Sequence, residues 1–242
     1  MRKRGFDSQD SRWFSPTELV KLRQANRDIT WLINRGYKFE NSVTFVSNRF
    51  LFSNRQREAL KRTICTKQQR VTRAAKKQSL TKLKDGPIYI DGFNLIITLE
   101  VALSRGTLVV GNDGCLRDLA GLRGTYKLIE QTDQALRLIA DFLNRYDVPK
   151  VIFYLDAPVS NSKNLKSRIL FIMNLFCIPT EVELVPNADC VLSKRERIVS
   201  TDAILLDQCI SYFDLSQSII HHYLKTLEVI DFSLLQGGEA DD

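Results

Sequence analysis

At residues 151–156 the chain reads Val151-Ile152-Phe153-Tyr154-Leu155-Asp156. The five apolar side chains do not alternate with polar ones, which is typical of a parallel strand covered by helices on both faces. Similar short runs at residues 88–91, 181–185, 197–200 and 228–231 are separated by stretches with helical patterns. This alternation predicts an α/β domain, a three-layer α/β/α Rossmann-like sandwich around a mostly parallel five-stranded sheet.

Charge divides the 242-residue chain into two parts near Lys84. Residues 1–84 hold 21 Lys or Arg and 6 Asp or Glu, a net charge of +15, whereas residues 85–242 carry a net charge of −8. Gly86 and Pro87 interrupt a helical pattern at the same place, just before the first predicted strand. The sequence therefore predicts a small, basic, all-α domain over 1–84 and the acidic α/β domain over 85–242.

Three helices are expected in the basic part. Ser15, Pro16 and Glu18 form a helix start, and the helix should run to about Arg35. A short helix over 42–50 and a long basic helix over 53–79 should follow. The cations of the long helix are Arg55, Arg57, Lys61, Arg62, Lys67, Arg70, Arg73, Lys76 and Lys77. Such a surface could neutralise several phosphates of a nucleic acid. A solvated helix, a helix docked on the acidic half and a helix-turn-helix unit are the alternatives.

Aspartates follow the predicted strands, where α/β sheets bind their ligands. Asp91 ends the first strand, Asp156 follows Leu155, and Asp202 follows the strand near residue 198. Asp189 begins the helix after the third strand. One such aspartate commonly caps a helix, but several carboxylates at one edge repel each other unless a cation lies among them or some are protonated. Oxygen ligands of this kind suit Mg²⁺ or Mn²⁺, and such ions assist phosphodiester cleavage.

The order of these acids resembles a known superfamily. Asp91-Gly92-Phe93-Asn94, Asn187-Ala188-Asp189-Cys190-Val191-Leu192 and Ile198-Val199-Ser200-Thr201-Asp202 are similar to the acidic motifs of PIN-like nucleases, especially the NYN branch, over about residues 87–232. The resemblance implies RNA cleavage with a divalent metal. It makes Asp91, Asp189 and Asp202 ligands of Mg²⁺ or Mn²⁺, or groups that orient the attacking water. Asn94 would fix the first turn, and Asp156 would complete the acidic centre.

The pattern departs from the NYN branch at one position. NYN proteins typically carry another acid two residues after the one that matches Asp202, where this chain has Ile204. Asp207, one helical turn further on, would either replace that acid or face solvent. A catalytically inactive PIN-like protein that binds nucleic acid or acts as an adaptor is therefore the alternative. Residues 32–37 and 53–60 also resemble a family of uncharacterised prokaryotic proteins in which a domain of unknown function precedes a PIN-like domain.

The long stretch between residues 100 and 130 has two interpretations. Its glycines and cations suggest a functional loop, in which Arg117, Arg123 and Lys127 hold a phosphate and Tyr126 stacks on a base. The alternative is an ordered hairpin or flap that covers the edge of the sheet.

The expected partner is a nucleic acid, and the preference for RNA rests on the family resemblance alone. The apolar runs are far shorter than the roughly 20 residues of a membrane span, and no signal peptide is visible, so we expect a cytoplasmic protein without a membrane partner. PIN-like domains often dimerise, which leaves a homodimer open. A small-molecule phosphohydrolase and a protein-interaction module remain as further alternatives.

Overall fold

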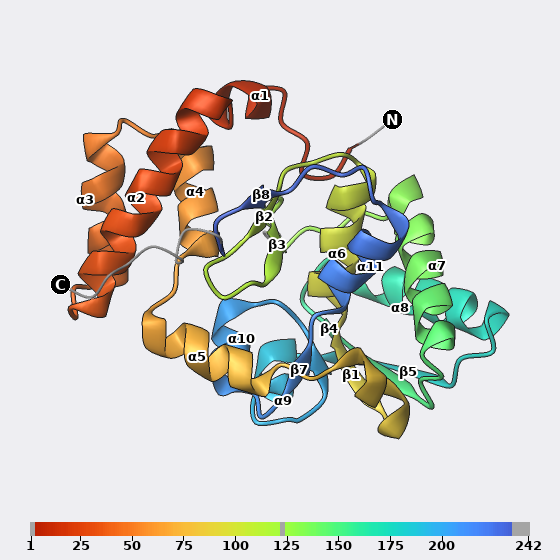
Figure 1. Cartoon of the computed structure of the whole chain (residues 1–242). Coiled ribbons are helices and arrows are strands. Elements are labelled where there is room, and N and C mark those ends of the chain that lie inside the picture. Colours follow the sequence, from red (N-terminus) through yellow and green to blue (C-terminus); the bar gives the residue numbers. More distant parts are fainter. Residues whose placement is uncertain (1–2, 122–123, 234–242) are drawn as a thin grey trace.

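The basic N-terminal part is helical, as the sequence predicts (Figure 1). The computed structural model describes residues 3–121 and 124–233. The first elements are α1 (Asp10–Trp13), α2 (Pro16–Asn34), α3 (Phe39–Arg49), α4 (Asn54–Thr63), α5 (Lys67–Lys76) and the 3₁₀-helix η1 (Leu80–Asp85). Helices α1 to α4 form one group, and α5 leaves it to lie against the second part of the chain (Figure 1).

A five-stranded, all-parallel sheet forms the centre of the second part, which confirms the predicted fold class. Its strands are β1 (Ile88–Asp91), β4 (Val151–Asp156), β5 (Thr180–Val185), β6 (Ile198–Val199) and β7 (Tyr212–Phe213). They lie in the order β5-β4-β1-β6-β7. The chain builds outward from β1 to β5 on one side and then crosses to β6 on the other. The carboxyl ends of β1 and β6 therefore flank the position where α/β sheets open a ligand crevice.

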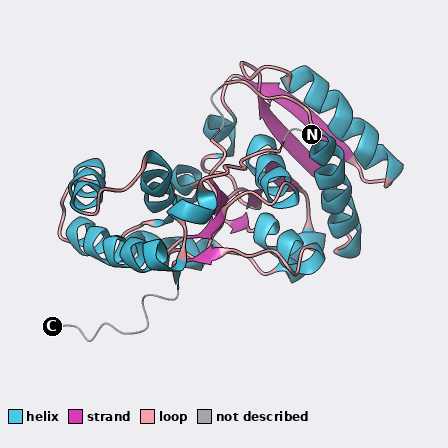
Figure 2. Cartoon of the chain, turned by 90° about the horizontal axis from the view of Figure 1, so that it is seen from above, coloured by secondary structure: helices cyan, strands magenta, loops and turns pink. Residues whose placement is uncertain are grey.

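Helices cover both faces of this sheet (Figure 2). They are α6 (Gly92–Leu103), α7 (Glu130–Arg145), α8 (Ser162–Leu175), α9 (Ala188–Leu192), α10 (Ala203–Gln208) and α11 (Leu215–Tyr223). One buried cluster unites the strands with α6, α7, α8 and α11, and another unites the opposite strand faces with α9 and α10. Phe153 belongs to the first cluster and its neighbours Ile152 and Tyr154 to the second, which explains the non-alternating apolar run in β4.

A second, three-stranded sheet contains β2 (Leu108–Val110), β3 (Leu116–Asp118) and β8 (Ile230–Asp231). The stretch between residues 100 and 130 thus contains an ordered antiparallel hairpin, preceded by the end of α6, a helix that the sequence analysis did not anticipate. The strand predicted at 228–231 exists but pairs with β2 instead of joining the central sheet. The fifth central strand is β7, which was not among the predicted strands because two residues are too few to show alternation.

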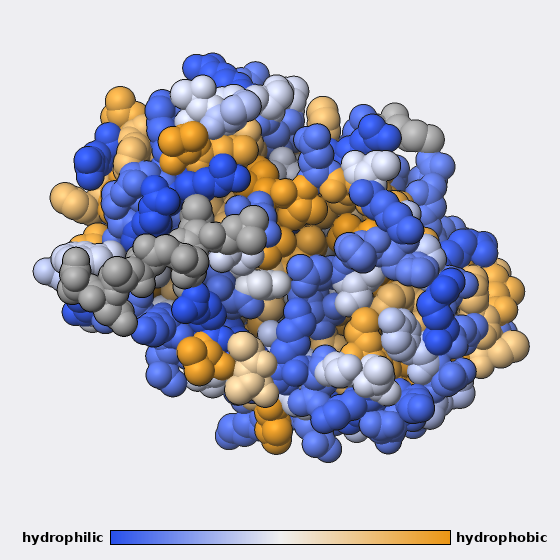
Figure 3. Space-filling model, in the orientation of Figure 1, coloured by the Kyte–Doolittle hydropathy of each residue, from blue (hydrophilic) through white to orange (hydrophobic). Residues whose placement is uncertain are grey.

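The two parts of the chain share a hydrophobic core. Leu22, Ile29 and Leu60 of the N-terminal helices pack in one buried cluster with Val109 of β2 and Phe232 near the C-terminus. A groove also runs between α1 and α2 on one side and the 222–231 segment on the other, where apolar groups gather near the middle of Figure 3. None of the helices among the described residues is both long and apolar enough to cross a membrane.

The prediction of a single long helix over 53–79 is wrong, because an extended segment breaks the helix between α4 and α5. Ile64 is extended, and Thr66 begins a new helix with a capping box: its hydroxyl accepts from the Gln69 amide at 3.1 Å, and Gln69 Oε1 accepts from the Thr66 amide at 3.0 Å. The break reorients the second half of the basic segment. In α5 the apolar Val71 is exposed, whereas Arg73 is buried.

Replacing the capping residue should destabilise the protein selectively. Thr66→Ala removes the acceptor for the Gln69 amide, and we expect the free energy of unfolding to fall by about 1 kcal/mol. Thr72→Ala is the matched control, because Thr72 lies inside the same helix and caps nothing. Urea unfolding of both variants measures the difference. Equal losses in the two variants would contradict the capping role.

Candidate active site

Asp91 is the buried carboxylate at the carboxyl end of β1, with 7% of its surface exposed. It also caps α6, because its Oδ1 accepts from the Asn94 amide at 3.3 Å. Its Oδ2 accepts from the Ser200 hydroxyl at 3.0 Å, and Ser200 follows β6. Asp91 therefore joins the ends of the two strands that flank the crevice.

Asn94 connects the same two elements through its side chain. Its Oδ1 accepts from the Thr201 amide at 3.0 Å and lies 3.3 Å from the Thr201 hydroxyl. The side chain of Asn94 thus holds the loop that leads from β6 into α10. Its role extends beyond the first turn, where the resemblance placed it.

Of the three other predicted acids, Asp202 and Asp156 accept hydrogen bonds from backbone amides, whereas Asp189 lies in the first turn of α9. Asp202 caps α10, because its Oδ1 accepts from the amides of Ile204 at 2.9 Å and Leu205 at 3.0 Å. Asp156 at the end of β4 accepts from the Ala188 amide at 2.8 Å. That bond fixes the start of α9, where Asp189 is exposed in the first turn. These capping roles satisfy one oxygen of Asp202 and one of Asp156.

The four carboxylates influence one another electrostatically. Burial, followed by the negative charges of Asp189 and Asp202, raises the pKa of Asp91 to about 7. Desolvation and the charges of Asp202 and Asp156 raise the pKa of Asp189 above its ordinary value. The sheet therefore brings the predicted acids into one field of mutual repulsion, which a bound cation would relieve.

The donor set is chemically suited to a hard divalent cation, because it consists of carboxylate oxygens. Asp91, Asp189 and Asp202 are the residues that would hold such an ion. Within 3–121 and 124–233, no three acidic, histidine or cysteine side chains are gathered tightly enough to form a ready-made metal site. Coordination by all three aspartates would accordingly require side-chain movement.

A hollow of about 230 Å³ opens beside Asp202. Its lining consists of Arg62, Asn94, Arg117, Asp118, Thr201, Asp202, Ala203 and Ile204. Arg62 comes from α4, so the N-terminal part contributes directly to this hollow. Among the described residues, the half-buried guanidinium of Arg62 has no hydrogen-bond or ion-pair partner. Asp118 was not among the predicted site residues, because it ends a short strand of the second sheet and not a strand of the central one.

Most cations predicted to contact nucleic acid are engaged inside the protein. Arg55 binds Asp10 and the carbonyls of Gly5 and Leu119. Arg57 donates to the Phe52 carbonyl and Asn48, Lys61 pairs with Glu40, and Lys77 lies 3.5 Å from Asp214. Lys76 donates to the carbonyls of Leu206 and Asp207. Arg70 is half-buried and, like Arg62, has no partner among the described residues. The docked-helix alternative describes α5 better than a free phosphate-binding face.

Three residues were assigned to nucleic-acid contact although the structure buries them. Arg73 is 2% exposed and binds Asp113 and Asp207, and Arg117 is 5% exposed and binds Asp113. Tyr126 is fully buried, with its hydroxyl donating to Glu100 at 2.6 Å. The two guanidiniums and the tyrosine ring are therefore structural, and the prediction that they meet phosphate or base is wrong.

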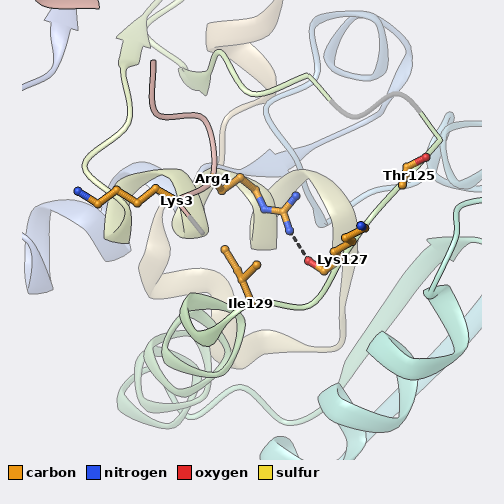
Figure 4. Close-up of a pocket in the computed structure, with 5 residues that line it drawn as sticks. All are labelled: Lys3, Arg4, Thr125, Lys127 and Ile129. Carbon is orange, nitrogen blue, oxygen red and sulfur yellow. Dashed lines mark hydrogen bonds between the residues drawn. The ribbon is translucent and has the colours of Figure 1, made fainter. Parts of the chain in front are cut away.

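The other two predicted residues of this loop are separate from the acidic centre. Lys127 is exposed and lines a small hollow with Lys3, Arg4, Thr125 and Ile129, in which its carbonyl accepts from Arg4 at 2.6 Å (Figure 4). This hollow shares no lining residue with the one beside Asp202. Arg123 lies outside the described residues.

The two residues at the departure from the NYN pattern have distinct surroundings. Ile204 is 67% exposed and lines the hollow next to Asp202. The carboxylate of Asp207 accepts from Arg73 at 2.7 and 2.9 Å and from Gln69 at 2.8 Å. Asp207 therefore neither replaces the additional acid nor simply faces solvent, because it anchors α5 to α10.

Two family models match the chain in succession. Residues 21–76 match "Protein of unknown function (DUF434)", and residues 80–218 match "Domain of unknown function (DUF5616)". The chain belongs to the DUF5616 family. No PIN or NYN family model matches it. An uncharacterized protein of Methanocaldococcus jannaschii is 35% identical over 191 residues, which are 77% of this chain and 89% of that protein. No solved structure matches the chain.

The stability of this DUF5616 protein should depend on the protonation of Asp91. The folded chain holds the Asp91 proton up to a pKa of about 7, against an ordinary value of 3.8, so the free energy of unfolding falls as pH rises between these values. Asp91→Asn removes this dependence. Relative to the wild type, the variant should gain up to about 4 kcal/mol between pH 4 and pH 8.

Urea unfolding at both pH values tests this expectation. Asp85→Asn is the control, because Asp85 is an exposed acid just before β1 and should show no comparable gain. A difference between wild type and Asp91→Asn that stays constant with pH would contradict the raised pKa of Asp91.

Proposed function

We propose that this protein is a metal-dependent ribonuclease that hydrolyses phosphodiester bonds at the carboxyl edge of its central sheet. One observation carries the proposal: Asp91, Asp189 and Asp202 follow three separate strands, and the charges of Asp189 and Asp202 add to burial in raising the pKa of Asp91 at that edge. Structural carboxylates can cap helices without such mutual repulsion. Acids kept close together against it are typical of sites that bind a cation or perform proton chemistry.

The residues at this edge would have separate roles in such a site. Asp91, Asp189 and Asp202 would hold Mg²⁺ or Mn²⁺, which when bound supplies charge stabilisation and lowers the pKa of water. Ser200 donates to Asp91 and so orients its carboxylate, and Asn94 holds the loop that carries Asp202. Asp156 positions the start of α9 through the Ala188 amide and adds negative charge near Asp189.

Arg62 is the cation best placed to meet a phosphate beside the acidic centre. It lines the same hollow as Asp202, and its guanidinium has no partner among the described residues. A carboxylate cluster that must approach a polyanion needs such a positive group nearby. RNA as the substrate follows the family resemblance in the acidic motifs. The cytoplasmic location, the absence of a membrane partner and the homodimer stay predictions from the sequence.

A PIN-like protein that binds RNA without cutting it is the second candidate. Its support is the residue two positions after Asp202, which is the exposed Ile204, together with the pairing of Asp207 with Arg73. Among the described residues of α10, Asp207 is the one further acid, and its carboxylate is turned toward α5. The two candidates agree on binding and differ in hydrolysis.

Cleavage assays separate the candidates. We expect the purified protein to cut end-labelled single-stranded or hairpin RNA with Mn²⁺ or Mg²⁺ and not with EDTA. Asp91→Asn should lower the rate at least about 100-fold, because it removes a ligand charge while preserving the shape of the side chain. Asp85→Asn, the exposed neighbour on the far side of β1, should keep the wild-type rate.

The outcomes assign the function. Cutting that needs both the metal and Asp91 would establish the nuclease. RNA that is bound by the wild type but survives intact across metals and substrates would establish the adaptor. Failure to bind any oligonucleotide at low salt would exclude both and favour a small-molecule phosphohydrolase or a protein-interaction module.

The role of Arg62 can be tested by comparing a substitution there with one at Lys61, its neighbour in the sequence. Arg62→Gln should weaken RNA binding and reduce the slope of log affinity against log salt by about 0.7, the value for one lost phosphate contact to a single strand. Lys61→Gln is the control, because Lys61 pairs with Glu40 and does not line the hollow. Filter binding between 50 and about 200 mM salt measures both. Identical slopes for the two variants would remove Arg62 from the site.

A further inference from the structure

Two buried arginines from different parts of the chain share one carboxylate. Arg73 of α5 donates to Asp113 Oδ2 at 2.6 Å, and Arg117 of β3 donates to both oxygens of Asp113 at 2.6 and 2.9 Å. All three side chains are at least nine-tenths buried. Burial raises the pKa of Asp113, but hydrogen bonds and charges from Arg117 and Arg73 outweigh it, and the pKa lies below its ordinary value. The carboxylate therefore stays ionised.

This network holds both ends of α10, the helix that Asp202 caps. Before the helix, Arg117 donates to the Thr201 carbonyl at 2.7 Å, directly next to Asp202. At the other end, Arg73 forms a two-pronged ion pair with Asp207, at 2.7 and 2.9 Å. Lys76 adds bonds to the carbonyls of Leu206 and Asp207. Helix α10 is short, so its direction depends on these contacts more than on its own hydrogen bonds.

The same network also reaches the hollow. Arg117 donates to the Arg62 carbonyl at 3.1 Å and lines the hollow itself. It therefore fixes the backbone from which the Arg62 side chain extends, together with the loop that carries Asp202. A buried guanidinium with this many bonds tolerates little displacement, because each lost bond leaves a desolvated polar group.

We propose that Arg73 is a positioning residue of the acidic centre, through which the N-terminal helices hold α10 and Asp202 in place. Arg73 does this from both sides, through Asp207 directly and through Asp113 and Arg117. The charge of Arg73 is paired with Asp113 and Asp207 inside the protein. Arg73 therefore orients the site and does not contact RNA. The kinetic consequence of this inference rests on the proposed function, whereas its structural consequence does not.

The structural consequence is measured by hydrogen exchange on the full chain. In Arg73→Met and in Asp207→Asn, the amides of Ile204 and Leu205, which donate to Asp202, should exchange about tenfold faster or more. Helix α7, on the opposite face of the sheet, should keep its exchange rates and so report that the fold is intact. Lys67→Met, which removes an exposed cation of α5 outside the network, should leave α10 exchange unchanged. Unchanged protection of α10 in both network variants would overturn the proposal.

The kinetic consequence separates orientation from RNA contact. We expect kcat to fall about 10-fold to 100-fold in Arg73→Met with KM for RNA near the wild-type value, and Arg73→Lys to restore part of kcat. A raised KM with unchanged kcat would mean that Arg73 acts by binding RNA, and it would overturn the proposal.

Asp207→Asn guards against a folding defect of Arg73→Met, because Asp207 is partly exposed and Asn keeps its shape. If α7 loses protection in Arg73→Met, Asp207→Asn decides by the same two readouts. If the wild type cuts no RNA, the proposed function fails, whereas the exchange experiment still decides whether Arg73 positions α10.

Discussion

The rest of the structure depends on the carboxylate of Asp113, which two buried arginines share. Arg73 comes from the N-terminal helices, whereas Arg117 and Asp113 lie in the hairpin, so two segments far apart in the sequence meet at one anion. Removing one partner would leave a desolvated charge, which is far more destabilising than losing a surface pair. The network therefore ties the two halves of the chain together and fixes the helix that Asp202 caps.

Part of the positive charge of the first half is paired within the molecule. A net charge of +15 in the first 84 residues suggests a polyanion as partner. In the structure, Arg55, Arg73, Lys76 and Lys77 bind carboxylates or carbonyl groups of the chain itself. Charge composition cannot distinguish internal pairing from binding of a polyanion, because an arginine that pairs with a carboxylate and one that is free to bind a phosphate are identical in a sequence. Arg62 alone among the predicted cations lines the hollow beside Asp202 with a free guanidinium, as judged over the described residues.

The acidic centre follows from the order of the strands. Because β1 and β6 are neighbours and run parallel, the acids that follow them meet at one edge, with Ser200 and Asn94 joining the two loops. Burial, together with repulsion from Asp189 and Asp202, raises the pKa of Asp91 to about 7. The charge state of this edge therefore changes with pH near neutrality.

By itself, the sequence determined the fold class, most strands of the central sheet and the strand-end aspartates, because apolar runs and the residues that end them are local features. Tertiary structure alone decided that β7 completes the sheet while β8 belongs to another, since strands of two residues carry no periodic signal. It also decided which cations are paired with groups of the protein itself. The partners of Arg73 lie 40 and 134 residues away, and no local pattern encodes a contact across such distances.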